Sequence, residues 1–205
     1  MQGFTRFFGA IGALTLGAAQ AHAYVLDFQT IDTAGPQYAV GTVFNQGGSV
    51  ASLSEFTLNE GGTVSNGRAR RVFFGPSIPT LNYALTLKNV TLNLALPSGG
   101  VGGFSFNTSL PRGFINLSVN GVSTIIDGAT IDGLSIGGVT FASTLTGADD
   151  PALRSLVTAS GVVESFSIGG SGLTVDNFSG SPAPSPGTGL MLIGSAGLGA
   201  LRRRR

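Results

Sequence analysis

The sequence predicts an all-β protein, an antiparallel two-sheet β-sandwich of jelly-roll type. Apolar and polar residues alternate over many short segments, which is typical of half-buried strands. Glycine is abundant, with 33 of 205 residues, and Asn-Gly pairs mark tight turns. About ten such segments recur at roughly 8 to 15 residue spacing, as in sandwiches. A right-handed β-solenoid is the alternative because 128–138 is glycine-rich, although no repeat of fixed length is present.

The first 23 residues have the organisation of a signal peptide. An apolar run covers 7–19, and Ala21-His22-Ala23 fits the small-x-small rule for signal peptidase. The run is too short for an ordinary membrane-spanning helix. We therefore expect a removable signal helix over 1–23, with cleavage after Ala23 and a β-sandwich domain over 24–180.

Period-two alternation predicts the first strands of this domain. Leu26 and Phe28 share one face of a strand over 24–28. Leu53 and Phe56 are the expected core residues of a strand over 50–58. Further strands are predicted over 39–44 and, after the Asn66-Gly67 turn, from Val72 onward.

Two hairpins are predicted in the middle of the chain. Between 81 and 97, alternate apolar residues flank Lys88-Asn89, which would form a two-residue turn and place both apolar sets on one side of a sheet. Between 115 and 126, two alternating segments flank Asn120-Gly121, the pair that a type I′ turn favours. Later strands are predicted over 138–145, 162–168 and 173–178. A short helix is predicted over 149–154, where Pro151 follows a capping Asp150.

The charge and residue types of the domain exclude several functions. Five of the eleven basic residues lie in the two ends, which leaves six basic against ten acidic residues in 24–180, a net charge of −4. Nucleic-acid binding needs a concentrated basic face, so no nucleic-acid partner is expected. Cysteine is absent and the one histidine, His22, lies in the signal peptide. Ser-His-Asp and Cys-His nucleophile systems are therefore excluded, and we expect no enzyme activity.

Oxygen ligands remain available for a structural calcium ion. If the first and last strands lie side by side, Asp27 would meet Asp176 and Asn177, and these three residues are the candidate metal ligands. The alternative is that Asp176 caps a strand and Asp27 faces solvent. Other than this calcium, no cofactor is expected.

Two carbohydrate functions stay open as alternatives. A carbohydrate-binding module would contact exopolysaccharide, but the chain lacks Trp and Tyr83 falls on the predicted core face, so no aromatic platform is evident. Arg68, Arg70 and Arg71 would either meet an acidic polysaccharide or protect a strand edge. A glycoside hydrolase would need two converging carboxylates. The acidic candidates are Asp27, Asp32, Glu55, Glu60, Asp127, Asp132 and Glu164.

The last segment, 181–205, is a sorting tail. A Pro-punctuated linker precedes an apolar, glycine-rich stretch over 187–201, which is followed by Arg202, Arg203, Arg204 and Arg205. Fifteen residues make about 22 Å of helix, short of the roughly 30 Å hydrocarbon core. We expect a short C-terminal hydrophobic helix that is a marginal anchor, with the arginines as a basic stop on the cytoplasmic side.

This tail resembles the PEP-CTERM sorting signal of Gram-negative bacteria. Pro182 and Pro184 match the two prolines of the Pro-Glu-Pro motif, Ala183 stands where the family has Glu, and the four arginines match its basic cluster. The resemblance implies export, anchoring in the inner membrane, cleavage near the motif by an exosortase and delivery to the cell surface or extracellular matrix. The expected function is that of a non-enzymatic, exported surface protein.

Overall fold

The computed structural model describes residues 23–29, 31, 37–58, 62–73, 83–109, 114–127, 131–145 and 154–183. Strands form all the regular structure in these ranges, and every strand pair there is antiparallel. The prediction of an all-β, antiparallel two-sheet protein is therefore confirmed. The solenoid alternative does not fit, because solenoid strands pair in parallel. The two predicted terminal helices lie outside the described residues.

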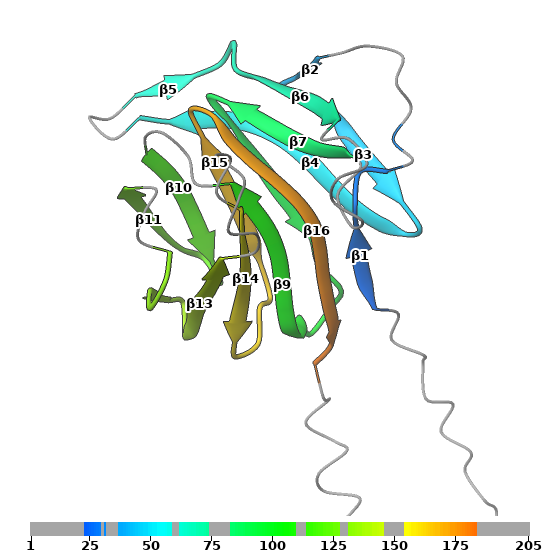
Figure 1. Ribbon diagram of the computed structural model, residues 1–205, viewed down its shortest axis with the longest axis vertical. Helices are drawn as coiled ribbons and strands as arrows, with labels where there is room; N and C mark the ends of the chain where they lie inside the picture. The colour runs from blue at the N-terminus through cyan, green and yellow to red at the C-terminus, as the bar shows by residue number, and fades with distance from the viewer. Residues whose placement is uncertain are drawn as a thin grey trace, which may run out of the picture.

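One sheet has nine strands (Figure 1). In spatial order its main path is β12 (Ser135–Ile136), β13 (Val139–Leu145), β14 (Arg154–Ser160), β9 (Val101–Ser109), β16 (Leu173–Pro182), β7 (Tyr83–Lys88), β6 (Arg68–Phe73) and β2 (Tyr38–Ala39). The ninth strand, β1 (Tyr24–Leu26), pairs with the second half of β16, whose first half pairs with β7.

The other sheet has seven strands. Its main path is β11 (Val122–Asp127), β10 (Phe114–Val119), β15 (Phe166–Gly170), β8 (Val90–Ala95), β4 (Ser49–Thr57) and β3 (Val43–Gln46), and β5 (Thr63–Val64) pairs with the end of β4. Neighbours in this sheet come from distant parts of the chain, since β15 lies between β8 and β10.

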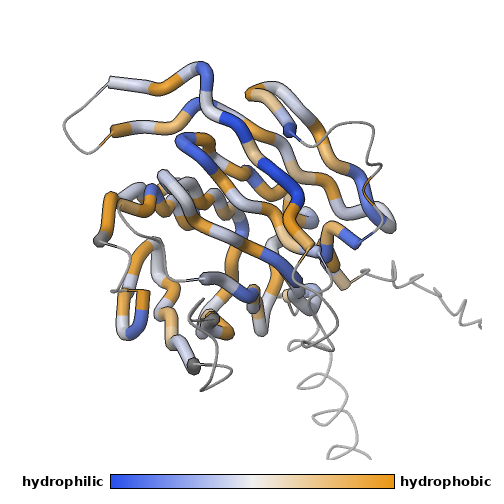
Figure 2. The backbone as a smooth tube through the Cα atoms, turned by 45° about the horizontal axis from the view of Figure 1, so that its top comes forward, coloured by the Kyte–Doolittle hydropathy of each residue, from blue (hydrophilic) through white to orange (hydrophobic). Residues whose placement is uncertain are grey.

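The two sheets face each other across one apolar core. Apolar and polar residues alternate along most strands (Figure 2), and the inward apolar residues of both sheets form a single buried cluster. Aromatic rings bridge the sheets: Phe104 of β9 lies 4.9 Å from Phe166 of β15, centroid to centroid. Because 24–180 holds no cysteine, this core replaces the covalent cross-links that stabilise many small exported domains.

The predicted hairpin at Asn120-Gly121 is confirmed. Val119 of β10 faces Val122 of β11, and both turn residues have positive φ, 51° and 78°. A type I′ turn requires this conformation at both central positions, and Asn and Gly tolerate it. The inward-facing residues of β10 are fully buried, whereas Val122 on the edge strand is 50% exposed.

The predicted hairpin at Lys88-Asn89 is wrong. β7 belongs to the nine-stranded sheet and β8 to the seven-stranded sheet, so the chain crosses between sheets at Asn89. Asn89 has a φ of 53° and its N–H donates to the carbonyl of Gly170 at 2.9 Å. This single residue in the left-handed conformation turns the chain sharply, so that β8 continues in the other sheet instead of pairing with β7. Leu85 and Leu87 before the crossing and Val90, Leu92 and Leu94 after it are buried, as predicted, but they belong to opposite sheets of the core.

Several predicted strand limits differ from the structure. The strand predicted over 39–44 is interrupted by a turn at Val40-Gly41 between β2 and β3, and β6 begins at Arg68 instead of Val72. Strands β9 and β14 were not predicted as such. β14 begins at Arg154, the last residue of the predicted short helix, whose other residues lie outside the described ranges.

Gly67 is required where the chain crosses between the sheets. A Cβ atom at this position would lie 1.7 Å from the carbonyl oxygen of Asn89, so a side chain there forces the backbone to move. We expect Gly67→Ala to lower the free energy of unfolding by roughly 3 kcal/mol, at the upper end of overpacking costs. Chemical denaturation of the purified protein measures this change.

Gly102→Ala is the matched control, because no atom lies within 4 Å of its Cβ position and its φ is not positive. We expect it to change stability by less than about 1 kcal/mol. Equal losses in the two variants would contradict this account of the crossing.

Candidate functional site

The predicted processing points lie together because the first and last strands pair. Tyr24 is in register with Gly180, and Leu26 with Phe178, so β1 begins beside the point where β16 nears its end (Figure 1). Ala23, the predicted signal cleavage residue, is exposed and immediately precedes β1. Ala21 lies outside the described residues. The first and last described residues, Ala23 and Ala183, therefore lie at the same end of the domain.

β1 also binds the other sheet. The Tyr24 hydroxyl donates to the carbonyl of Val50 at 3.1 Å, and the Val25 N–H donates to Ser49 Oγ at 3.0 Å. Further along, Gln46 Oε1 accepts from the N–H groups of Asp27 and Phe28. The segment that follows the predicted cleavage point thus connects the nine-stranded sheet to the β3–β4 hairpin of the seven-stranded sheet.

The predicted sorting motif starts inside the last strand. Pro182 ends β16 and is in register with Val101, and the Ala183 N–H donates to the carbonyl of Gly100 at 3.2 Å. Pro184 and the arginines at 202–205 lie outside the described residues. The first two motif residues, Pro182 and Ala183, are therefore held by the sheet.

The three predicted calcium ligands lie around the β1–β16 pair. Asp27 and Asn177 directly follow and precede the paired residues Leu26 and Phe178. Asp27 Oδ1 accepts hydrogen bonds from the Gln46 side chain and from the Gln29 N–H. Asp176 is buried opposite Asn107 of β9. In the described part of the chain, no three His, Cys, Asp or Glu residues lie close enough to hold a metal. The calcium site stays a prediction.

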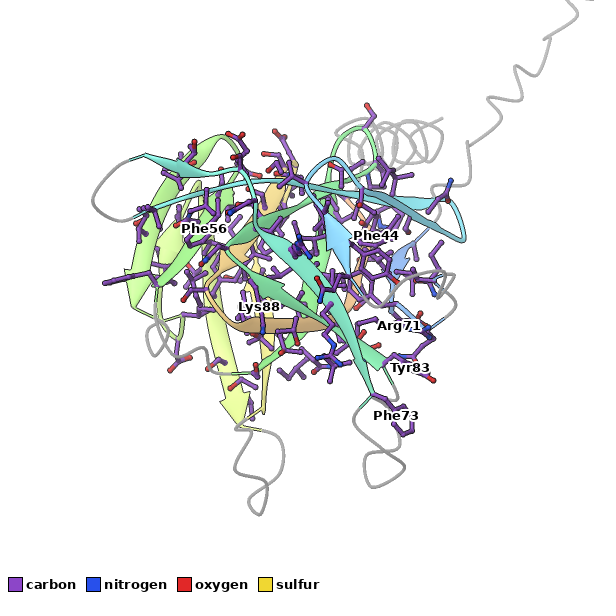
Figure 3. The ribbon with its side chains drawn as sticks, turned by 90° about the horizontal axis from the view of Figure 1, so that it is seen from above. Phe44, Phe56, Arg71, Phe73, Tyr83 and Lys88 are labelled. Carbon is purple, nitrogen blue, oxygen red and sulfur yellow. The ribbon has the colours of Figure 1, made fainter. Side chains whose placement is uncertain are left out.

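Tyr83 begins β7 on the same face as the buried Leu85 and Leu87, as predicted, but is itself only half-buried. The Arg71 guanidinium lies 3.6 Å from its ring centroid and donates to the carbonyls of Gln29 and Ile31. Phe73, which is 56% exposed, lies beside the Tyr83 ring (Figure 3). Arg71 therefore has a structural role, whereas Arg68 and Arg70 are exposed on the strand.

The outer face of the seven-stranded sheet carries rows of small polar side chains that were not predicted as a site. One row crosses five strands in register, from β11 to β4: Ser123, Ser118, Ser167, Asn93 and Ser52. The next row contains Ile125, Asn116, Gly169, Thr91 and Ser54. Neighbouring strands are about 4.8 Å apart, so the polar groups repeat at that interval along each row.

The end of β4 folds over this face. Phe56 is buried but lies outside the central core, and its ring contacts the outer face at Gly169, where a Cβ atom would be 3.0 Å from Phe56 Cδ2. The Thr57 carbonyl accepts a hydrogen bond from the Asn116 side chain of β10. These two contacts hold Phe56 and Thr57 over the outer face as a wall; together with Glu55, which still pairs with Val90 of β8, we call this segment the β4 arm.

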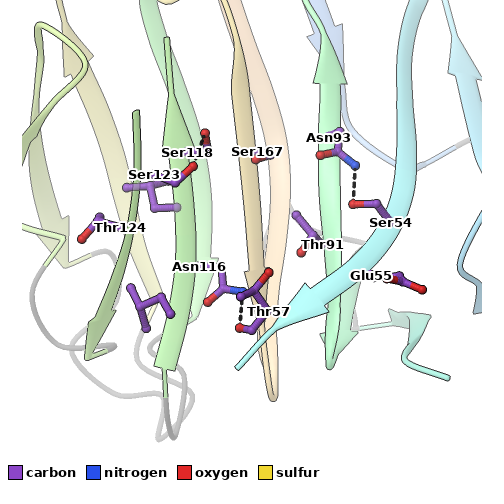
Figure 4. A pocket seen from close by; sticks show the side chains of 12 residues that line it. Ser54, Glu55, Thr57, Thr91, Asn93, Asn116, Ser118, Ser123, Thr124 and Ser167 are labelled. Atoms are coloured by element: carbon purple, nitrogen blue, oxygen red, sulfur yellow. Dashed lines mark hydrogen bonds between the residues drawn. The ribbon is translucent and has the colours of Figure 1, made fainter. Parts of the chain in front are cut away.

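A groove of about 680 Å³ lies between the β4 arm and β11 (Figure 4). Its lining is polar and nearly uncharged: Ser54, Glu55, Thr57, Thr91, Asn93, Asn116, Leu117, Ser118, Ser123, Thr124, Ile125 and Ser167. Glu55 is the only charged residue of this lining. The sequence signal for the groove was the run of Ser, Thr and Asn at alternate positions of several strands.

Two polar groups of the groove are unpaired. Thr91 is 9% exposed, and its hydroxyl makes no hydrogen bond to the described residues. Asn116 Oδ1 is buried and also has no partner among them. Asn116 Oδ1 is enclosed, whereas the Thr91 hydroxyl is accessible from the groove and is free to bind a ligand or water.

Comparisons with family models, with curated protein sequences and with solved structures found no match for the chain. In the ranges that the structure describes, no helix has the length and apolar character needed to cross a membrane.

Burial of Tyr24 predicts a loss of stability at high pH. Desolvation raises the pKa of its hydroxyl above the ordinary value of 10. The unfolded chain therefore ionises first, and the free energy of unfolding should fall as pH rises above 10, by about 1.4 kcal/mol per pH unit. Denaturant titrations between pH 8 and about pH 11.5 measure this slope.

Tyr24→Phe removes this ionisable group and should flatten the alkaline slope. At neutral pH it should cost about 1 kcal/mol, because the hydrogen bond to Val50 is lost. Tyr38→Phe retains Tyr24 and serves as the control that keeps the slope. An unchanged slope in Tyr24→Phe would show that another group causes the alkaline loss.

Proposed function

We propose that the chain is an exported, non-enzymatic protein of the bacterial surface or extracellular matrix. In this proposal, 1–23 direct export, 24–180 form the β domain, and 181–205 anchor the precursor in the inner membrane until an exosortase-type enzyme cuts the tail. The sandwich is assigned to the jelly-roll type, which the adjacent first and last strands support. Exopolysaccharide is the proposed partner at the surface.

The observation that carries the proposal is the position of β1 and β16 relative to the two sequence signals. The first strand starts at Tyr24, one residue after the expected signal cleavage, and the last strand ends at Pro182, within the sorting motif. Removal of 1–23 and of the residues after Ala183 would leave every described strand intact. A folded domain bounded in this way suits a protein that loses both ends during export.

The proposal limits where the sorting enzyme can cut. Residues up to Ala183 are bonded to β9 or to Gly100, and a protease needs an extended chain that is free to enter its active site. We therefore place the cut after Ala183, where cleavage does not require the end of β16 to separate from β9.

Intact-mass measurement of the protein from its native cell envelope tests both ends. We expect a mature chain that begins at Tyr24 and ends at or shortly after Ala183. A chain that still ends in Arg205 would overturn the processing proposal, and a chain that retains Met1 would overturn export through a cleaved signal. A C-terminus before Ser181 would show that the strand end separates before cleavage.

Replacement of the four terminal arginines by serine tests the basic stop. Clustered arginine resists translocation, so we expect the variant to leave the membrane fraction with its tail uncut. Arg70→Ser on β6 changes an exposed arginine of the domain and should not alter fractionation. Retention of the serine variant in the membrane, with a normally processed end, would contradict the proposed role of the arginines.

A further inference from the structure

We propose that the outer groove of the seven-stranded sheet binds a neutral oligosaccharide segment. The inference does not depend on export or on processing of the tail. It rests on three features of the groove: the register of its polar side chains, its low charge and the unpaired hydroxyl of Thr91.

The polar rows match a ligand that both donates and accepts hydrogen bonds at regular intervals. Ser118, Ser167 and Asn93 come from neighbouring strands β10, β15 and β8, in register. Hydroxyl groups both donate and accept, as do amide groups, and sugar hydroxyls have the same capacity. Their spacing of about 4.8 Å along the row is comparable to the length of one sugar ring.

The low charge of the groove selects against ionic ligands. Glu55 would repel phosphate, uronic acid and other anions, and the lining contains no Lys or Arg to attract them. A groove of 680 Å³ lies within the range of small-ligand sites, about 300 to 1,000 Å³.

Thr91 gives the second, independent indication of a ligand. Its side chain is more than nine-tenths buried, lines the groove and has no hydrogen-bond partner among the described residues. Its neighbour Asn93 is instead satisfied, because its amide donates to Ser54 Oγ at 2.9 Å (Figure 4). A sugar hydroxyl beside Thr91 would pair its free hydroxyl without disturbing the Asn93 bond.

Binding is proposed here without cleavage. Glycoside hydrolysis uses two carboxyl groups on opposite sides of the scissile bond, and the lining contains only Glu55. The lining contains no aromatic residue, and Phe56 in the adjacent β4 arm is only 3% exposed. Recognition would then depend on hydrogen bonds instead of ring stacking, so each site should bind weakly and long polysaccharides should bind best through several sites or repeats.

Affinity electrophoresis of the full chain in detergent tests the proposal. Native gels would contain dextran or galactomannan as neutral polysaccharides and alginate as the anionic one. We expect at least one neutral polysaccharide to retard the protein in a saturable manner, independently of salt, and alginate to have no effect. Absence of retardation by both neutral polysaccharides, or equal and salt-sensitive retardation by alginate, would overturn it.

Variants then place the binding in the groove. Ser167→Tyr puts a large side chain at the centre of the polar row and should weaken binding at least tenfold. Thr158→Tyr, on the exposed face of β14 in the other sheet, is the matched control and should bind as the parent does. Equal binding by Ser167→Tyr and the parent would overturn the proposed location.

Thr91→Val keeps the test decisive if Ser167→Tyr does not fold. Valine has the shape of threonine without the hydroxyl, and that hydroxyl has no partner in the described protein. We expect about fivefold weaker binding, the usual effect of one neutral hydrogen bond, with an unchanged or higher melting temperature. A lower melting temperature with unchanged binding would show that the hydroxyl serves the fold and not a ligand.

Discussion

The fold depends on the ring of Phe178, which touches rings from both sheets. It stacks on Phe106 with centroids 5.2 Å apart, and it contacts Phe28, Phe104 and Phe166 at 6.1 to 6.3 Å. Phe166 belongs to the seven-stranded sheet and the other rings to the nine-stranded sheet or the segment after β1. In a domain without cysteine, such an aromatic cluster supplies a large buried apolar area and a defined packing geometry.

A β-bulge directs Phe178 into the core. Between Asp176 and Ser179, β16 has one more residue than β9, and Asn177 at a φ of 51° is in the left-handed region. The extra residue restores the inward direction for Phe178, three positions after the inward Val175. Asparagine occupies the left-handed conformation at three bends of the chain. Besides Asn177 in the bulge, these are Asn89 at the crossing between the sheets and Asn120 in the hairpin turn. Its short polar side chain tolerates this backbone conformation better than most residues.

The two faces of the seven-stranded sheet have separate roles. The inner face carries apolar residues that close the core, and the outer face carries hydroxyl and amide groups that no core requires. Because successive side chains of a strand point to opposite faces, the same strands supply both the inner and the outer face. The groove therefore needs no additional strands. The first and last described strands, β1 and β16, lie in the other sheet, so the groove includes neither end of the described domain.

The sequence alone determined which residues face inward along most strands and where the Asn120-Gly121 hairpin turns, because both depend on side chains within a few positions. It also predicted a β domain over 24–180, and the described strands run from Tyr24 to Pro182. Only the tertiary structure decided which strands pair. By their pattern, Leu87 and Val90 fit a hairpin. They lie in opposite sheets instead, because β7 pairs with β6 and β16, whereas β8 pairs with β4 and β15. The groove likewise needed the fold, since its residues come from five strands that only long-range pairing brings into register.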